Sequence, residues 1–110
     1  MGEADADRVL AARITATAAR YARGRPLTET EEAEALASLI ELAAGRTDLL
    51  AQEAGLAIGF SEGSPGESRQ RQAAQLLIKA GADRELIPAW VHVGRRRAEA
   101  ARHIPYTGGR

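Results

Sequence analysis

The side chains best suited to bind another molecule gather near the C-terminal end of the chain. Arg95, Arg96 and Arg97 are consecutive, Arg102 follows them, and Trp90 is the one tryptophan among 110 residues. Tryptophan and arginine often dominate the binding energy of protein interfaces. Three consecutive residues span about 200° of a helix, so a single row of phosphate contacts is not predicted. We therefore interpret these five residues as a candidate binding surface for a protein partner, for example an acidic one.

Two interpretations of Trp90 compete. It is the largest side chain in a sequence with few aromatic residues, so it is expected in the core, packed near Phe60. Alternatively, it anchors an interface, with Arg95 or Arg97 on its rim. We favour core packing. The ordinary role of the neighbouring arginines is a solvated helix face whose aliphatic stems cover apolar surface.

The remaining polar residues do not indicate catalysis or metal binding. His92 and His103 would lie about 16 Å apart along a helix, too far to ligate one metal ion. The chain has no cysteine, which excludes disulfides, thiolate nucleophiles and cysteine metal ligands. The run GFSEGSPGE follows a predicted helix and lacks the lysine of a phosphate-binding loop. We therefore expect no enzyme activity and no catalytic, cofactor-binding or metal-binding residues.

The run LLAQEAGLAIGFSEG resembles a known motif. It is similar to the first half of a helix-turn-helix, in which an L-A-x-x-A-G-apolar run ends one helix and opens the turn. The matching residues are Leu50, Ala51, Ala54, Gly55 and Leu56. The second half departs from the motif, because no basic residue lies between Arg46 and Arg69 to contact phosphates. The resemblance implies a degenerate helix-turn-helix around residues 47–62 and, with it, DNA binding.

The elements that must position these residues are helices arranged around the most apolar stretch, residues 49–60. Only Gln52 and Glu53 interrupt it, so a helix over about 47–62 would be apolar nearly all round and therefore buried. Small residues recur along it at every fourth position and allow a neighbouring backbone to approach closely: Ala51, Gly55, Gly59 and Gly63. Glycine costs roughly 1 kcal/mol in a helix relative to alanine, so this ridge indicates tight packing.

Capping signals predict the helices that precede the central one. The first helix runs over residues 4–23. The second begins with a capping box of Thr28 and Glu31 and ends at Gly45. The predicted buried face of this second helix consists of Ala33, Leu36, Leu39, Ile40 and Ala43.

The later helices are predicted in the same way. Thr47 is the expected cap of the central helix, and the run from Ser64 to Glu67 combines two signals for the start of a fourth helix. Asp83 can cap one further turn. Pro88 disfavours helical geometry at the residue before it, so a fifth helix either kinks there or begins afresh with Pro88 at its first position. Its predicted packed side comprises Leu86, Trp90, Val91, Gly94, Ala98 and Ala101.

Length and composition predict a single all-α domain. The chain is long enough for one core, and no run alternates apolar and polar residues over the length of a strand. We predict a compact bundle of four or five helices over residues 1–104, followed by a flexible tail at 105–110. Neither a transmembrane helix nor a signal peptide is indicated, so the cytoplasm is the expected compartment.

The charges of the chain sum to zero but are unevenly distributed. Residues 28–67 carry nine acidic residues and one arginine, whereas residues 84–110 carry six arginines and two glutamates. We expect the acidic and basic side chains of these segments to pair with each other within the fold. The alternative is a basic C-terminal face that binds an acidic partner. By elimination, we predict a non-enzymatic, regulatory protein that acts through a protein partner, without cofactor or membrane and with self-association left open. The alternative is nucleic-acid binding through the basic C-terminal helix or the degenerate helix-turn-helix.

Overall fold

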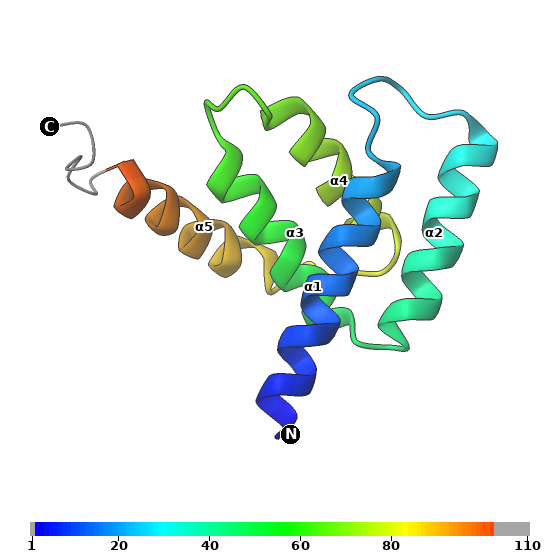
Figure 1. Ribbon diagram of the computed structural model, residues 1–110, viewed down its shortest axis with the longest axis horizontal. Helices are drawn as coiled ribbons and strands as arrows, with labels where there is room; N and C mark the ends of the chain where they lie inside the picture. The colour runs from blue at the N-terminus through cyan, green and yellow to red at the C-terminus, as the bar shows by residue number, and fades with distance from the viewer. Residues whose placement is uncertain (1, 103–110) are drawn as a thin grey trace, which may run out of the picture.

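The computed structural model describes residues 2–102, which form five α-helices and contain no β-strand. In chain order these are α1 (Glu3–Tyr21), α2 (Glu29–Ala43), α3 (Thr47–Ser61), α4 (Glu67–Lys79) and α5 (Ile87–Arg102). Figure 1 shows α5 at one end of the molecule and α2 at the other, with α3 between them. The predicted all-α bundle is confirmed. The predicted tail and the predicted domain end at residue 104 lie outside the described residues.

The apolar helix α3 is the central element, as its sequence predicts. It contacts each of the other four helices. Leu50, Ala51 and Ala54 are buried on α3 and share the core with Leu39 of α2 and Leu77 of α4. Most side chains in this core are alanine or leucine. The helices can therefore pack closely, because few large side chains separate their backbones.

The last helix, α5, is attached to the bundle through α3 alone, since no other helix of residues 2–102 contacts it. Glycines on both helices let the two backbones touch. A Cβ atom built at Gly55 would lie 2.8 Å from the carbonyl oxygen of Ile87, and one built at Gly94 would lie 2.8 Å from that of Leu56. These distances are shorter than real Cβ contacts, so α3 and α5 meet at a distance that only glycine permits.

The small-residue ridge of α3 extends over Ala51, Gly55 and Gly59. A Cβ atom at Gly59 would overlap the carbonyl oxygen of Val91, so even alanine does not fit there unless α5 moves. Gly63 is not part of this ridge. It lies in the exposed turn after α3 with a φ of 73°, a left-handed conformation that glycine adopts without strain.

The chain begins α5 afresh at Ile87 instead of continuing through a kink. Asp83 caps the preceding turn, because its carboxylate accepts a hydrogen bond of 3.1 Å from the backbone N–H of Glu85. Pro88 is the second residue of α5, where its missing N–H removes no helical hydrogen bond. The predicted packed side of α5 is confirmed at two positions and wrong at two: Gly94 and Ala98 are buried, whereas Leu86 and Ala101 are exposed.

The start of α2 follows its sequence signal, whereas the starts of α3 and α4 do not. Thr28 Oγ1 accepts a hydrogen bond of 3.1 Å from the N–H of Glu31, and the Glu31 carboxylate accepts one of 2.9 Å from the N–H of Thr28. This is the predicted capping box. Thr47 is already the first residue of α3 and caps nothing. Ser64 uses its backbone carbonyl to accept from the N–H of Glu67, which forms a turn before α4 in place of the predicted side-chain cap.

The helix α2 lies at the edge of the bundle (Figure 1). Part of its predicted buried face is exposed. Leu39 and Ala43 are buried as predicted, and Ala35 joins them. Ile40, however, is 53% exposed, and Ala33 is exposed too. The reason is that the neighbours of α2 reach it from one side only. A large apolar side chain therefore stays on the outer surface of the bundle.

Candidate functional site

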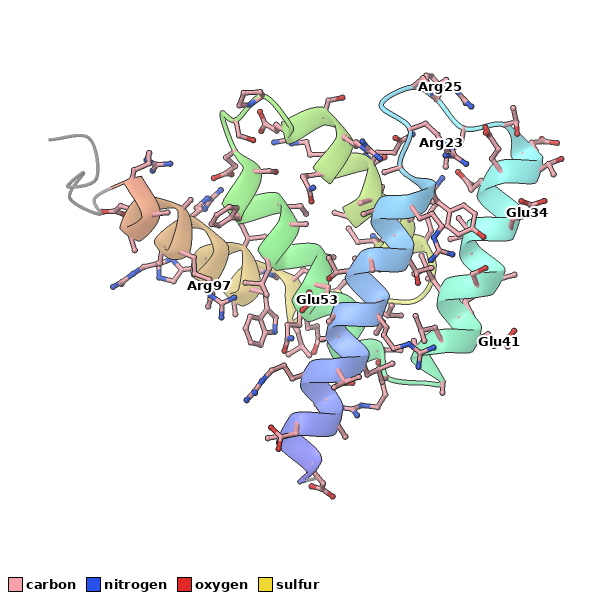
Figure 2. All side chains as sticks on the ribbon, viewed as in Figure 1. Arg23, Arg25, Glu34, Glu41, Glu53 and Arg97 are labelled. Atoms are coloured by element: carbon pink, nitrogen blue, oxygen red, sulfur yellow. The ribbon has the colours of Figure 1, made fainter. Side chains whose placement is uncertain are left out.

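An open groove runs between α1 and α5, with α3 as its floor. The two walls do not contact each other within the described residues, because each packs separately on α3. The groove has a volume of about 680 Å³, a size typical of ligand-binding sites. Figure 2 shows Arg97 on α5 and Glu53 on α3 beside this space. This α1/α3/α5 groove is lined by residues between Ala4 and Ala12, residues between Asp48 and Leu56, and Trp90 and Arg97.

Two of the predicted partner-binding residues, Trp90 and Arg97, line this groove from α5. They are two helical turns apart, about 10 Å along the axis, and so lie on the same side of α5. Trp90 is only partly buried and does not belong to the core, and Phe60 is 52% exposed. The predicted core packing of Trp90 near Phe60 is therefore wrong. The reason is the close approach of the two helices. The Cβ atom of Trp90 packs directly against Gly55 of α3, so the indole does not fit between α3 and α5.

The other three predicted residues lie outside the groove. Arg95 forms a bidentate ion pair with Glu62 at the end of α3, with nitrogen–oxygen distances of 2.8 and 2.9 Å. The hydrogen bonds from Arg95 lower the pKa of Glu62. Arg96 and Arg102 are exposed and make no ion pair within residues 2–102. The five predicted residues therefore do not form one surface. Trp90 and Arg97 line the groove, Arg95 pairs with Glu62, and Arg96 and Arg102 face solvent.

The carboxylates of Asp7 and Asp48, which line the groove, are both bound by Arg46. The guanidinium donates to Asp7 at 2.8 and 3.0 Å and to Asp48 at 3.1 and 2.9 Å. These hydrogen bonds lower the pKa of both carboxyl groups. The three side chains join α1 to the start of α3, and both carboxylates already have hydrogen-bond donors.

Glu53, the third acidic residue of the groove, is also engaged. Its carboxylate accepts hydrogen bonds from the hydroxyl of Thr15 and from the side-chain amide of Gln52. The groove donors on α5 differ, because neither the indole N–H of Trp90 nor the guanidinium of Arg97 has a hydrogen-bond partner within residues 2–102. The groove thus combines carboxylates that are already hydrogen-bonded with two donors on α5 that have no hydrogen-bond partner within residues 2–102.

The contribution of α1 to the groove was not indicated by the sequence. Ala11 and Ala12 extend the apolar lining that Leu49 and Leu56 provide on α3. Arg8 lies on the same wall, and its one ion pair there is an exposed contact of 3.5 Å with Asp5. The pattern of α1 predicts a helix but does not say which other helix stands opposite. That information exists only once α1 and α5 are both placed on α3.

The segment that resembles a helix-turn-helix does not form that motif. Residues 47–61 make one continuous helix, so no turn follows Gly55. Gly55 is instead buried against α5. The degenerate helix-turn-helix predicted around residues 47–62 is therefore wrong, and α5 remains the candidate element for nucleic-acid binding.

The protein is a small all-α bundle in which the last helix, α5, packs against α3 through glycines. His92 is exposed on α5, and His103 lies outside the described residues. In the part that the structure describes, no three histidine, aspartate or glutamate side chains are grouped so that they could hold a metal ion. No helix of residues 2–102 has the length and apolar character needed to cross a bilayer. Comparison with protein-family models, curated proteins and solved structures found no match.

Proposed function

We propose that this protein is a non-enzymatic interaction module that binds an acidic segment of a protein partner in the α1/α3/α5 groove. The observation that carries the proposal is the balance of donors and acceptors there. Trp90 and Arg97 present N–H groups without a partner in residues 2–102, whereas the groove carboxylates are already hydrogen-bonded. A partner that supplies carboxylates would satisfy these donors and leave no groove acceptor unpaired.

The apolar lining supports the same proposal. Ala12 is exposed, Leu56 and Trp90 are partly exposed, and all three line the groove. A partner side chain that covers them removes apolar surface from water, which is worth about 25 cal/mol per Å². Arg97 can bind a carboxylate through two parallel hydrogen bonds. Recognition would therefore combine an apolar anchor with a charged contact two turns away along α5.

Nucleic-acid binding is the second candidate, and one observation favours it. Arg96, Arg97 and Arg102 are all exposed on α5 and make no ion pair within residues 2–102. Phosphate contacts by such arginines are independent of sequence and weaken steeply with salt. On this alternative, Arg96 should matter as much as Arg97, whereas the groove proposal assigns the larger role to Arg97.

The fluorescence of Trp90 gives a direct test, because it is the one tryptophan of the chain and lines the groove. A helical peptide rich in Glu and Leu should change the Trp90 emission when titrated into the protein. A peptide of equal length rich in Lys and Leu should not. We expect Arg97→Glu to weaken binding of the acidic peptide about tenfold or more, as loss of a charged hydrogen bond does.

Arg96→Glu is the matched control, because it makes the same charge change one residue away and outside the groove. It should retain most of the binding at 0.15 M salt, where exposed charges are screened over about 8 Å. Equal losses in the two variants would contradict the groove proposal. Binding of random duplex DNA that falls with salt and falls equally in both variants would support nucleic-acid binding instead.

A further inference from the structure

The outer face of α2 presents an exposed apolar residue beside two unpaired carboxylates. Ile40 is 53% exposed although the helical pattern predicts it to be buried. Ala33 and Ala37 are also exposed and fall on the same stripe, at the i, i+4 and i+7 spacing of a helix that docks into a groove. Glu34 and Glu41 are exposed beside this stripe and make no ion pair within residues 2–102. This surface is referred to as the α2 face.

The carboxylates of the α2 face differ from two others on α2 in that they have no ion pair within residues 2–102. Glu31 and Glu32 are already paired, with Arg25 and Lys79, and do not belong to the outer face. The sequence of α2 contains no lysine or arginine. Two arginines of α1, Arg13 and Arg20, line a surface hollow together with Glu41 but form no ion pair with it. The carboxylates of Glu34 and Glu41 therefore remain free to accept hydrogen bonds.

The α2 face supplies the groups that the α1/α3/α5 groove lacks. The groove has apolar lining and two free donors, Trp90 and Arg97. The α2 face has the apolar side chain of Ile40 and free carboxylate acceptors at Glu34 and Glu41. The two surfaces complement each other in apolar area and, on the α5 side of the groove, in charge: Arg97 is basic and has no ion pair within residues 2–102, whereas Asp7, Asp48 and Glu53 on the other walls are already hydrogen-bonded.

On the basis of the proposed function, we propose that the acidic partner is a second copy of this chain, whose α2 face docks in the α1/α3/α5 groove. Figure 2 shows Glu34 and Glu41 on the outer edge of α2 and Arg97 on α5, at opposite ends of the molecule. Each copy therefore offers its groove to one neighbour and its α2 face to another. Such a heterologous contact adds copies head to tail and does not stop at a symmetric dimer unless the rotation closes a ring.

Two variants, each lacking one surface, test this arrangement. Arg97→Glu disables the groove and keeps the α2 face, whereas Ile40→Asp disables the α2 face and keeps the groove. In sedimentation velocity over a concentration series, the wild type should grow into species larger than a dimer, and each variant alone should stay monomeric or associate at least tenfold more weakly. An equimolar mixture of the two variants should form a one-to-one complex, in which the α2 face of Arg97→Glu occupies the groove of Ile40→Asp. This complex should not grow further, because the two surfaces that remain are both disabled.

Matched controls separate this contact from general effects of charge or lost apolar surface. Arg96→Glu controls for the charge change on α5. Val9→Asp controls for Ile40→Asp, since Val9 is 51% exposed on α1 and lies outside both surfaces. Both controls should assemble like the wild type. Thermal unfolding of every variant reports whether its fold is intact, and the Trp90 emission of the wild type should change with protein concentration while that of Ile40→Asp should not.

The outcomes distinguish this inference from the proposed function. A wild type that stays monomeric at all concentrations, while the acidic peptide still changes the Trp90 emission, overturns the second copy as partner and leaves the groove function standing. If the peptide has no effect either, both are overturned. Association that persists in Ile40→Asp alone, or a mixture of the two variants that stays monomeric, contradicts the head-to-tail contact.

Discussion

Glu31 links the start of α2 to the loop that precedes it. Its carboxylate accepts hydrogen bonds of 2.9 and 2.8 Å from the guanidinium of Arg25 and one of 2.9 Å from the backbone N–H of Thr28. These contacts, chiefly the hydrogen bond from Arg25, lower the pKa of Glu31 to about 2. The local capping box is therefore strengthened by a residue outside the helix. A carboxylate with such a low pKa stabilises the fold only while it is charged.

Substitution of Glu31 by glutamine should remove a pH-dependent part of the stability. The pKa of Glu31 falls from 4.5 to about 2 on folding, so its contribution is complete above pH 4.5 and is lost as the pH falls toward 2. The free energy of unfolding of the wild type should thus exceed that of Glu31→Gln at pH 7, and the difference should shrink between pH 4.5 and pH 2. Chemical denaturation across this range measures it. Glu29→Gln, at an exposed position of the same turn, is the control, and a difference that does not vary with pH would contradict the assignment.

At the scale of whole elements, the attachment of α5 is the unusual feature. A helix usually packs through large apolar side chains, but α5 meets α3 through Gly55, Gly59 and Gly94. Close backbone contact replaces side-chain interdigitation, and it displaces the indole of Trp90 to the side. The groove and the donors that line it are thus a consequence of how α5 is attached.

Addition of one methyl group at this contact should therefore move α5. A Cβ atom at Gly59 would overlap the carbonyl oxygen of Val91, so Gly59→Ala should lower the free energy of unfolding by about 1–3 kcal/mol, as overpacking does. The Trp90 emission should shift as well, because α5 carries the indole. Thermal unfolding and fluorescence check both effects. Gly66→Ala is the control, since it has a φ of −93° and nothing within 4 Å of its Cβ position, and equal behaviour of the two variants would show that α5 does not rest on Gly59.

The helix α1 is joined to the start of α3 by Arg46, which binds Asp7 on α1 and Asp48 on α3. Arg46→Gln should loosen the N-terminal half of α1, because two carboxylates would lose their shared donor. Amide hydrogen exchange should increase between residues 5 and 12 and stay unchanged in α4. Arg84→Gln, at an exposed position without an ion pair in residues 2–102, is the matched control. Unchanged exchange in α1 would show that the ion pairs do not hold this helix in place.

Across the whole molecule, stability and charge are both unevenly distributed. The largest fully buried side chains within residues 2–102 come from four different helices, none of them α5: Ile14, Leu39, Leu50 and Leu77. The molecule is 49 Å in its longest extent, with the basic helix α5 and the acidic helix α2 at opposite ends (Figure 1). The first distribution predicts where the fold opens most easily, and the second separates positive from negative charge along the molecule, as the proposed head-to-tail contact requires.

Native-state hydrogen exchange should show α5 as the least protected helix of the five. Local opening requires less free energy where few buried apolar side chains hold an element, and the buried residues of α5 are the small Gly94 and Ala98. We expect amides from Gly94 to Ala100 to exchange faster than those from Ala35 to Ala43 and from Ala73 to Leu77. The measurement is made at low protein concentration so that association does not protect α5. Protection of α5 equal to that of α4 would contradict this prediction.

The sequence by itself determined the features that depend on near neighbours along the chain. The helical segments, predicted as four or five, the capping box of Thr28 and Glu31 and the small-residue ridge over Gly55 and Gly59 rest on interactions within one or two helical turns. These contacts exist whatever the rest of the fold does, so periodicity and spacing can reveal them. The caps predicted at Thr47 and Ser64 were wrong because backbone turns at both places took over the role of the side chain.

Only the tertiary structure decided what the surface offers to a partner. Arg95 and Arg97 look alike in sequence, yet Arg95 is bound by Glu62 on another helix and Arg97 lines the groove. Likewise, Trp90 and Ile40 fit a buried helical face, but the contact of α5 on glycine and the position of α2 at the edge leave both partly or largely exposed. These outcomes depend on the angles and distances at which whole helices pack. Such quantities are set by contacts between residues far apart in the chain, which no local pattern records.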